Sequence, residues 1–185
     1  VSGFTDSVQL GEIGQVKLSD AVVGHARQIS GTPFALLKWR GIALDQFDGR
    51  NWSKSDRKHF PVRLTPDEQH VIHAVQNPGD AARYEILLEP LATNTLFAPY
   101  QVRAVSGSTQ DIEYDKDDSI YLRFPTARRF QYEVLSEIPN RSRMPAERTI
   151  EEKTPDDIAS RYLTLPQGID PRVEQLAREI TEKGN

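Results

Sequence analysis

Short apolar stretches alternate with polar residues along most of the chain and predict β-strands. In these stretches apolar side chains recur at every second position, the period of a strand with one buried face, and turn residues separate one stretch from the next. The expected strands are residues 16–19, 22–29, 34–44, 84–88, 96–98, 100–105, 112–114, 120–124 and 130–135. Their spacing of about ten residues is typical of sandwiches and barrels, so we expect a mainly β fold, an antiparallel β-sandwich-like domain.

The period changes from two to 3.6 at the end of the chain, where the sequence predicts a C-terminal α-helix over residues 171–183. Asp170 is a favourable N-cap, Pro171 suits the first helical position, and Gly184 is a stop signal. The apolar positions of this helix fall on one stripe: Val173, Leu176, Ala177 and Ile180. Such a stripe needs a covering surface, supplied either by the β domain or by a domain that follows.

Residues 65–76 fit two structures equally well. Thr65 as a cap, Pro66 in the first turn and Glu68 three residues after the cap resemble the start of a helix. The segment is short, however, and Asn77-Pro78-Gly79 follows at once, so an extended pair of segments around residues 70–75 is the alternative.

The composition divides the chain into parts. Between residues 138 and 155 it shifts to Pro, Arg, Glu and Ser with few apolar residues, as in a linker or a surface crossing. We therefore expect a β-sandwich-like domain over 1–137, a linker over 138–160 and a separate segment over 161–185. The chain begins with Val1 and ends just after the expected helix, so we expect it to be a fragment of something longer.

The 185 residues carry a net charge of −4, with no run of five basic residues, which argues against nucleic acid as a partner. No stretch is apolar for the roughly 18 to 20 residues of a membrane span, so we expect no direct membrane insertion. The chain has no cysteine, which excludes thiol nucleophiles, thiolate metal sites and disulfides within it. We expect no cofactor.

Several polar groups have the composition of a site, but each has a simpler interpretation. His70-x-x-His73 would present two imidazoles to one metal only if helical, and we favour ordinary surface histidines. Asp115, Asp117 and Asp118 with Glu113 form an acidic group that departs from a calcium loop and fits a solvated turn. Other turn interpretations apply to the carboxylates Asp45 and Asp48 and to the serines Ser106 and Ser108. A Ser-His-Asp triad assembled from distant positions is left open.

Trp39, Arg40 and Trp52 form the candidate interaction surface. The two indoles bracket a segment with a turn at Asp48-Gly49 and could present an aromatic platform to a glycan or peptide. The interpretation that we favour instead places both indoles in the core, where two strands of a hairpin meet.

A resemblance to a known family rests on segments spread over nearly the whole chain. They are GFTDSVQLGEIG at 3–14, WRG at 39–41, LDQFDGRNW at 44–52, LEPL at 88–91, LFAP at 96–99, YLTLP at 162–166 and IDPR at 169–172. With these segments the chain resembles the bacterial transglutaminase-like membrane proteins. Members of that family have an N-terminal bundle of membrane helices, an extracytoplasmic segment, and a transglutaminase or cysteine-protease-like core.

The resemblance implies that this chain is the extracytoplasmic segment, on the periplasmic side of a bacterial inner membrane, and that 161–185 holds the first helix of the core. The catalytic Cys, His and Asp of the family have no matching positions here. We therefore expect a non-catalytic accessory domain that positions the core or its substrate, with the core and the membrane bundle of the same chain as partners and a protein or peptide as substrate of the parent. The alternative is a binding module for envelope glycan, peptide or protein.

Overall fold

The computed structural model describes residues 7–9, 22–31, 33, 37–56, 58–91, 93–107, 111–125, 127–138 and 156–182. The segment 3–14 of the family resemblance and the expected strand 16–19 therefore lie largely or wholly outside the described residues. So do 139–155, most of the expected linker.

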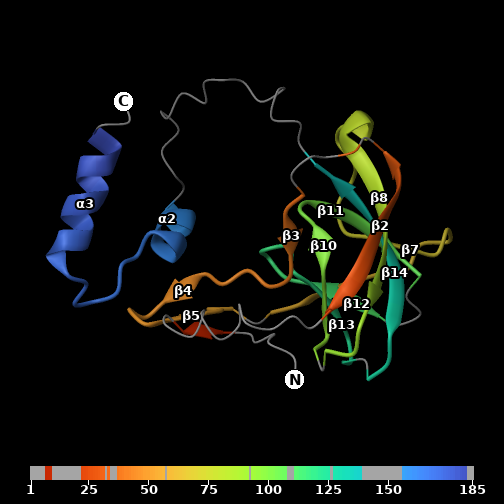
Figure 1. The fold of residues 1–185 in the computed structure, drawn as a ribbon, viewed down its shortest axis with the longest axis horizontal. Helices are drawn as coiled ribbons and strands as arrows, with labels where there is room; N and C mark the ends of the chain where they lie inside the picture. The colour runs from red at the N-terminus through yellow and green to blue at the C-terminus, as the bar shows by residue number, and fades with distance from the viewer. Residues whose placement is uncertain are drawn as a thin grey trace.

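Two antiparallel sheets form a sandwich (Figure 1). The larger sheet has the order β2-β8-β14-β11-β7, with β2 at Gly24–Gly31, β8 at Ala81–Leu88, β14 at Phe130–Glu137, β11 at Val102–Ser106 and β7 at Gln69–Val71. The smaller sheet has the order β6-β12-β13-β9, with β6 at Phe60–Val62, β12 at Ile112–Tyr114, β13 at Ile120–Leu122 and β9 at Thr95–Leu96. The prediction of an antiparallel, sandwich-like β domain is confirmed.

The core lies between these sheets because the strands alternate buried and exposed positions. In β8, Tyr84 and Ile86 point inward, whereas Arg83 and Glu85 point outward and pair with charged residues of the neighbouring strands. Both sheets contribute to one continuous cluster, which includes Tyr84, Ile86, Leu88, Leu96, Val102, Val105, Ile112, Ile120, Leu122, Tyr132 and Val134. The buried Tyr132 hydroxyl donates to the Phe97 carbonyl at 2.7 Å, so its polar group is satisfied.

A smaller three-stranded sheet, here called the arm, lies beside the sandwich. Its order is β1-β5-β4, with β1 at Val8–Gln9, β5 at Asn51–Ser53 and β4 at Gln46–Phe47. The hairpin β4–β5 turns at Asp48, whose carboxylate accepts the amides of Arg50 at 2.8 Å and Asn51 at 2.6 Å, and Gly49 supplies a φ of 102°. The turn expected at Asp48-Gly49 is thereby confirmed.

The chain enters the arm from the strand pair β3–β10. β3 covers only Trp39–Arg40 of the strand expected at 34–44, and it pairs with β10 at Ala98–Pro99. Residues 34–36 lie outside the described part.

Residues 65–76 form a turn, the short strand β7 and an irregular segment, and not a helix. Thr65 Oγ1 accepts the Gln69 amide at 3.2 Å and Glu68 has a φ of 56°, so the residues that resemble a helix cap instead form the turn that leads into β7. The only helical turn near this segment is the short η1 at Pro78–Asp80 among the described residues.

Two helices follow the sandwich in the part of the chain that the structure describes. α3 spans Pro171–Glu182, which confirms the predicted C-terminal helix, and every residue of it is exposed. α2 spans Asp156–Tyr162 and was not predicted, since its first residues fall in the segment that we expected to be a linker. None of the helices in the described ranges has the length and apolarity to cross a bilayer. In Figure 1 both helices lie on the same side of the sandwich as β4 and β5.

Candidate functional site

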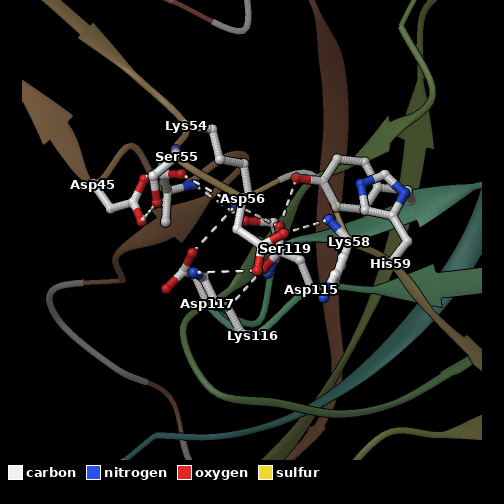
Figure 2. A network of polar contacts seen from close by, with 12 residues as sticks. Asp45, Lys54, Ser55, Asp56, Lys58, His59, Asp115, Lys116, Asp117 and Ser119 are labelled. Carbon is white, nitrogen blue, oxygen red and sulfur yellow. Dashed lines mark hydrogen bonds and ion pairs between the residues drawn. The ribbon is translucent and has the colours of Figure 1, made fainter. Parts of the chain in front are cut away.

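The turn between β12 and β13 holds a group of buried charged and polar side chains, here called the anchor cluster: Lys54, Asp115, Asp117, Ser119 and Tyr121 (Figure 2). Asp115 organises the turn, because its Oδ1 accepts the amides of Asp117 at 2.8 Å and Ser119 at 3.1 Å. A short polar side chain that binds amides two and four residues ahead stabilises a tight connection between two strands.

Lys54 comes from the residue after β5 and inserts its ammonium between two carboxylates of this turn. Its Nζ lies 2.6 Å from Asp115 Oδ2 and 3.3 Å from Asp117 Oδ2, and it donates to the Ala43 carbonyl at 3.3 Å. The three side chains are only 7%, 1% and 6% exposed. All three ammonium protons therefore have acceptors inside the protein.

Tyr121 closes the other side of the cluster. Its hydroxyl donates to Asp115 Oδ2 at 2.7 Å, and its ring stacks on His59 with centroids 4.2 Å apart and planes at 10°. His59 Nδ1 in turn lies 3.1 Å from Glu113 Oε2. These contacts fasten the segment between β5 and β6 to the β12–β13 hairpin.

Three separate parts of the chain meet at Asp117. The Arg40 guanidinium donates to its main-chain carbonyl, Lys54 pairs with its Oδ2, and the Tyr162 hydroxyl of α2 donates to its Oδ1 at 2.5 Å. The neighbouring Ser119 Oγ also accepts the Ala43 amide at 3.1 Å. The turn thus joins the sandwich to α2 and to the segments on either side of the β4–β5 hairpin.

The electrostatics of the cluster keep Asp115 ionised and Tyr121 protonated. Burial by itself raises the pKa of Asp115, but the hydrogen bonds from Lys54, Tyr121 and two backbone amides outweigh it and hold that pKa below its ordinary value. Burial and the hydrogen bond to Asp115 both raise the pKa of the Tyr121 hydroxyl. At neutral pH, Asp115 is an anion and Tyr121 is neutral.

This arrangement is unsuited to covalent or acid–base chemistry. An amine nucleophile must be deprotonated, whereas the Lys54 ammonium is held by two carboxylates and a carbonyl. A general acid or base needs a pKa near the working pH, whereas that of Asp115 is lowered. What the cluster can do is hold three chain segments in one geometry.

The prediction of a solvated acidic turn is confirmed for the turn and wrong for the solvation of Asp115 and Asp117. Asp115, Asp117 and Asp118 do lie at a turn between two strands, but Asp115 and the Asp117 side chain are buried. The reason is Lys54, which supplies the opposite charge that lets two carboxylates leave water.

The histidines also differ from expectation. His70 is buried in β7, with Nδ1 3.2 Å from the Val62 carbonyl, so its interpretation as a surface residue is wrong. His73 is half-buried, and its Nε2 lies 2.8 Å from Asp118 Oδ1. Within the described ranges, no three or more His, Asp or Glu side chains come together as a metal site.

Two further turn interpretations can be checked. Asp45 lies before β4, and its buried carboxylate accepts the amide and hydroxyl of Ser55 after β5, at 2.7 and 2.6 Å, which closes the open end of the hairpin. Gly107 follows β11 with a φ of 82°, as a turn requires, and Ser108 lies outside the described residues.

The favoured interpretation of the two tryptophans as core residues is wrong. Trp39 and Trp52 are 44% and 40% exposed, because β3 and β5 lie outside the two main sheets. Their ring contacts are separate: Trp39 meets Tyr84 edge-on at 6.3 Å, and Trp52 stacks on Phe47 at 4.9 Å. Arg40 is engaged internally, by the Asp117 carbonyl and by the Tyr100 ring 5.0 Å away.

The helix residues predicted to dock onto a neighbour lie on the surface. Val173, Leu176, Ala177 and Ile180 are all exposed on α3. Of the two sources of cover left open by the sequence, the described residues of the β domain supply none for this stripe.

Lys54 and Tyr162 are the residues that sequence reasoning missed. Both are single residues in polar segments, and their partners lie 63 and 45 positions away, so no local spacing marks them. The signal that could have found Lys54 is the neighbouring acidic group, which needs a cation if it is buried.

Comparison with known proteins places this fold in context. A family model described as the TgpA N-terminal domain matches residues 1–143. The protein-glutamine gamma-glutamyltransferase of Pseudomonas aeruginosa strain PAO1 is 27% identical over 183 residues, which are 98% of this chain and 24% of that protein. The chain thus spans about a quarter of the length of this curated relative.

Solved structures agree with the architecture. The crystal structure of the periplasmic domain of TgpA from Pseudomonas aeruginosa has a TM-score of 0.69 at 22% identity, over 99% of this chain and 57% of that one. The same domain bound to ethylmercury gives a TM-score of 0.69 at 22% identity, over 98% of this chain and 58% of the other. These structures share the fold, and the family model covers most of the sequence. The chain belongs to the TgpA N-terminal domain family.

Proposed function

We propose that this chain is a non-catalytic, periplasmic module of a membrane-anchored, transglutaminase-like protein, and that it positions the catalytic core or its substrate. The observation that carries the proposal is the anchor cluster, in which Asp117 binds the base of the arm and α2 at one buried turn. The absence of cysteine in the chain and the name of the relative as a glutamyltransferase support it.

The geometry suits a positioning role because a buried, fully bonded ion pair has one favourable arrangement. Lys54 and Asp115 are both removed from water, so a displaced partner would leave a charge uncompensated. Tyr162 connects the anchor cluster to α2, and eight residues separate the end of α2 from the start of α3. A body continuing from α3 would start from a defined place on the sandwich.

We divide the parent accordingly. Residues 1–137 form the β domain, 138–160 connect it onward, and 161–185 contain the first helix of the core, which is α3. The exposed apolar stripe of α3 then packs against core residues beyond this chain. The membrane-helix bundle and the core of the same polypeptide are the partners of this module.

Amine incorporation and peptide hydrolysis test the proposal. They are measured on this 185-residue chain and on the protein extended through the domain that follows, each with and without a thiol-blocking reagent. We expect activity in the extended protein alone, abolished by the reagent. Activity of the cysteine-free chain itself would overturn the proposal and return attention to its serine, carboxylate and histidine groups.

A second candidate, a module that binds envelope glycan or peptide, is favoured by the exposure of Trp39 and Trp52. Co-sedimentation with purified peptidoglycan sacculi tests it, with Trp39→Ala and Trp52→Ala as variants. Retention of the protein by sacculi, weakened by either substitution, would support it, and equal sedimentation with and without sacculi would reject it.

A further inference from the structure

We infer that the arm carries a second docking surface for the domain that follows α3, formed by Val8, Phe47 and Trp52. This inference rests on the proposed function and gives the following domain two contacts with this chain, one on α3 and one on the arm.

The arm has one apolar face. Val8 and Phe47 are each the register partner of Trp52, on opposite sides of it, so the three side chains form a row across three strands. The Phe47 and Trp52 rings stack with planes at 26°. The alternate positions, Gln9, Gln46, Asn51 and Ser53, are polar.

This row is incompletely covered. Val8 is 37% and Trp52 40% exposed, although both belong to paired strands. A sheet of such short strands gains stability only when its apolar face packs against something. Trp is also the side chain that most often dominates a protein interface. A partner that packed on this apolar row would stabilise the arm, and the exposed indole of Trp52 suits such a contact.

The anchor cluster directs the rest of the polypeptide toward the arm. Arg40 and Lys54, which flank the arm in sequence, and Tyr162 of α2 all bind Asp117. In Figure 1 the arm and both helices lie on one side of the sandwich. A body that packs on the exposed stripe of α3 is therefore brought to the side of the sandwich on which the arm lies.

The occupant that we assign is the domain that follows α3, because the related periplasmic domain is larger than this chain and α3 leaves an apolar stripe uncovered. This chain accounts for 57% of the crystallised periplasmic domain of TgpA, so a large part of that folded unit has no counterpart here. The last element of this chain, α3, has its apolar stripe exposed as well. One following body can cover both surfaces without any other molecule.

Hydroxyl-radical footprinting with mass spectrometry tests the inference residue by residue. Oxidation rates of Trp52, Trp39 and Leu176 are compared between the 185-residue chain and the extended protein. We expect Trp52 and Leu176 to react several-fold more slowly in the extended protein. Trp39 is the matched control, equally exposed but on β3, and its rate should stay the same.

The outcomes separate the two claims. Equal Trp52 rates in both proteins, with Leu176 protected and thiol-dependent activity present, would overturn the arm surface and leave the proposed function standing. Loss of thiol-dependent activity with no protection at either residue would overturn both. Protection of Trp52 that grows with protein concentration would assign the row to a second copy, and protection that requires lipid vesicles would assign it to the membrane; either result contradicts the inference.

A variant adds a second readout. Trp52→Ala in the extended protein should speed limited proteolysis between the two domains several-fold, whereas Trp39→Ala should not. Equal cleavage rates for the two variants would contradict the inference, and circular dichroism confirms that each variant is folded.

Discussion

Lys54 neutralises two buried carboxylates, and this role defines the strongest single-residue prediction. Lys54→Met should lower the free energy of unfolding by about 3–5 kcal/mol, because it leaves Asp115 and Asp117 buried without their cation. Urea unfolding followed by circular dichroism measures the loss. The control is Arg27→Met, which breaks a 2.9 Å pair with Glu85 but at a side chain 71% exposed, and should cost less than about 1 kcal/mol. Similar losses for both variants would show that the buried ion pair of Lys54 stabilises the fold no more than an exposed one does.

Asp115 also makes the free energy of unfolding depend on pH. Its pKa is lowered in the folded protein, so as the pH falls below about 5 the unfolded chain takes up a proton that the folded one resists. This contribution is fully present above the ordinary carboxyl pKa of about 4 and is lost as the pH falls through the folded value. Asp115→Asn should therefore flatten the fall in unfolding free energy as the pH drops below about 5. An unchanged slope in urea titrations at several pH values would contradict this reading.

What the sequence predicts about single residues depends on how local their partners are. Asp48 and Gly49 were identified correctly because their bonds lie within three residues. The turn at Asp115 was identified for the same reason, but its burial was not, since that depends on Lys54 from a distant strand. The interpretation that Trp39 and Trp52 fill the core where two strands of a hairpin meet fails because β3 and β5 belong to different small sheets outside the sandwich.

Two glycines with positive φ show how differently the elements tolerate a side chain. Gly31 ends β2 against β8, and a Cβ there would overlap the Ala81 carbonyl oxygen and come within 2.6 Å of Ala82 Cα. Gly49 in the β4–β5 turn has open space around it. Gly49→Ala should cost about 1 kcal/mol from the backbone alone, and Gly31→Ala about 2 kcal/mol more from the collision. Thermal and urea unfolding of the two variants measures the difference, and equal costs would contradict the packing of β2 on β8.

The exposed stripe of α3 predicts self-association of the 185-residue chain when the following domain is absent. Leu176 and Ile180 are the largest side chains of the stripe, and helices shield such surfaces by pairing. Analytical ultracentrifugation should show concentration-dependent dimerisation, lost on Leu176→Gln with Ile180→Gln. The control is Glu174→Gln with Glu182→Gln, on the same helix, which should dimerise as before. A monomer at high concentration would contradict this prediction.

Elements that repeat the pattern several times were predicted well, and so were the short strands β12 and β13, whereas the short strands of the arm were not. β8 and β14 alternate over eight residues, and α3 repeats its stripe over three turns, so local sequence was enough. The arm consists of strands of two or three residues, too short to show a period. α2 has only seven residues in a polar region, and its Tyr162 reaches a turn 45 positions away.

In the part of the chain that the structure describes, the sandwich, the arm and α2 meet at one buried turn, and α3 follows α2. The sandwich explains stability, since its core is continuous between two sheets. The arm and α3 explain why we assign the chain a supporting role, since both present apolar surface outside that core. Membership of the TgpA N-terminal domain family fits a module that works as part of a longer protein.

The central claim is that this module positions a catalytic core, and its removal from the parent protein tests that claim most directly. Residues 22–138 are deleted from the parent protein, and protein crosslinking is measured per reactive thiol, counted with an alkylating reagent. We expect the thiol to remain reactive while crosslinking of protein substrates falls at least tenfold, because the core survives but is no longer held in place. Crosslinking per thiol equal to that of the intact parent would contradict the account.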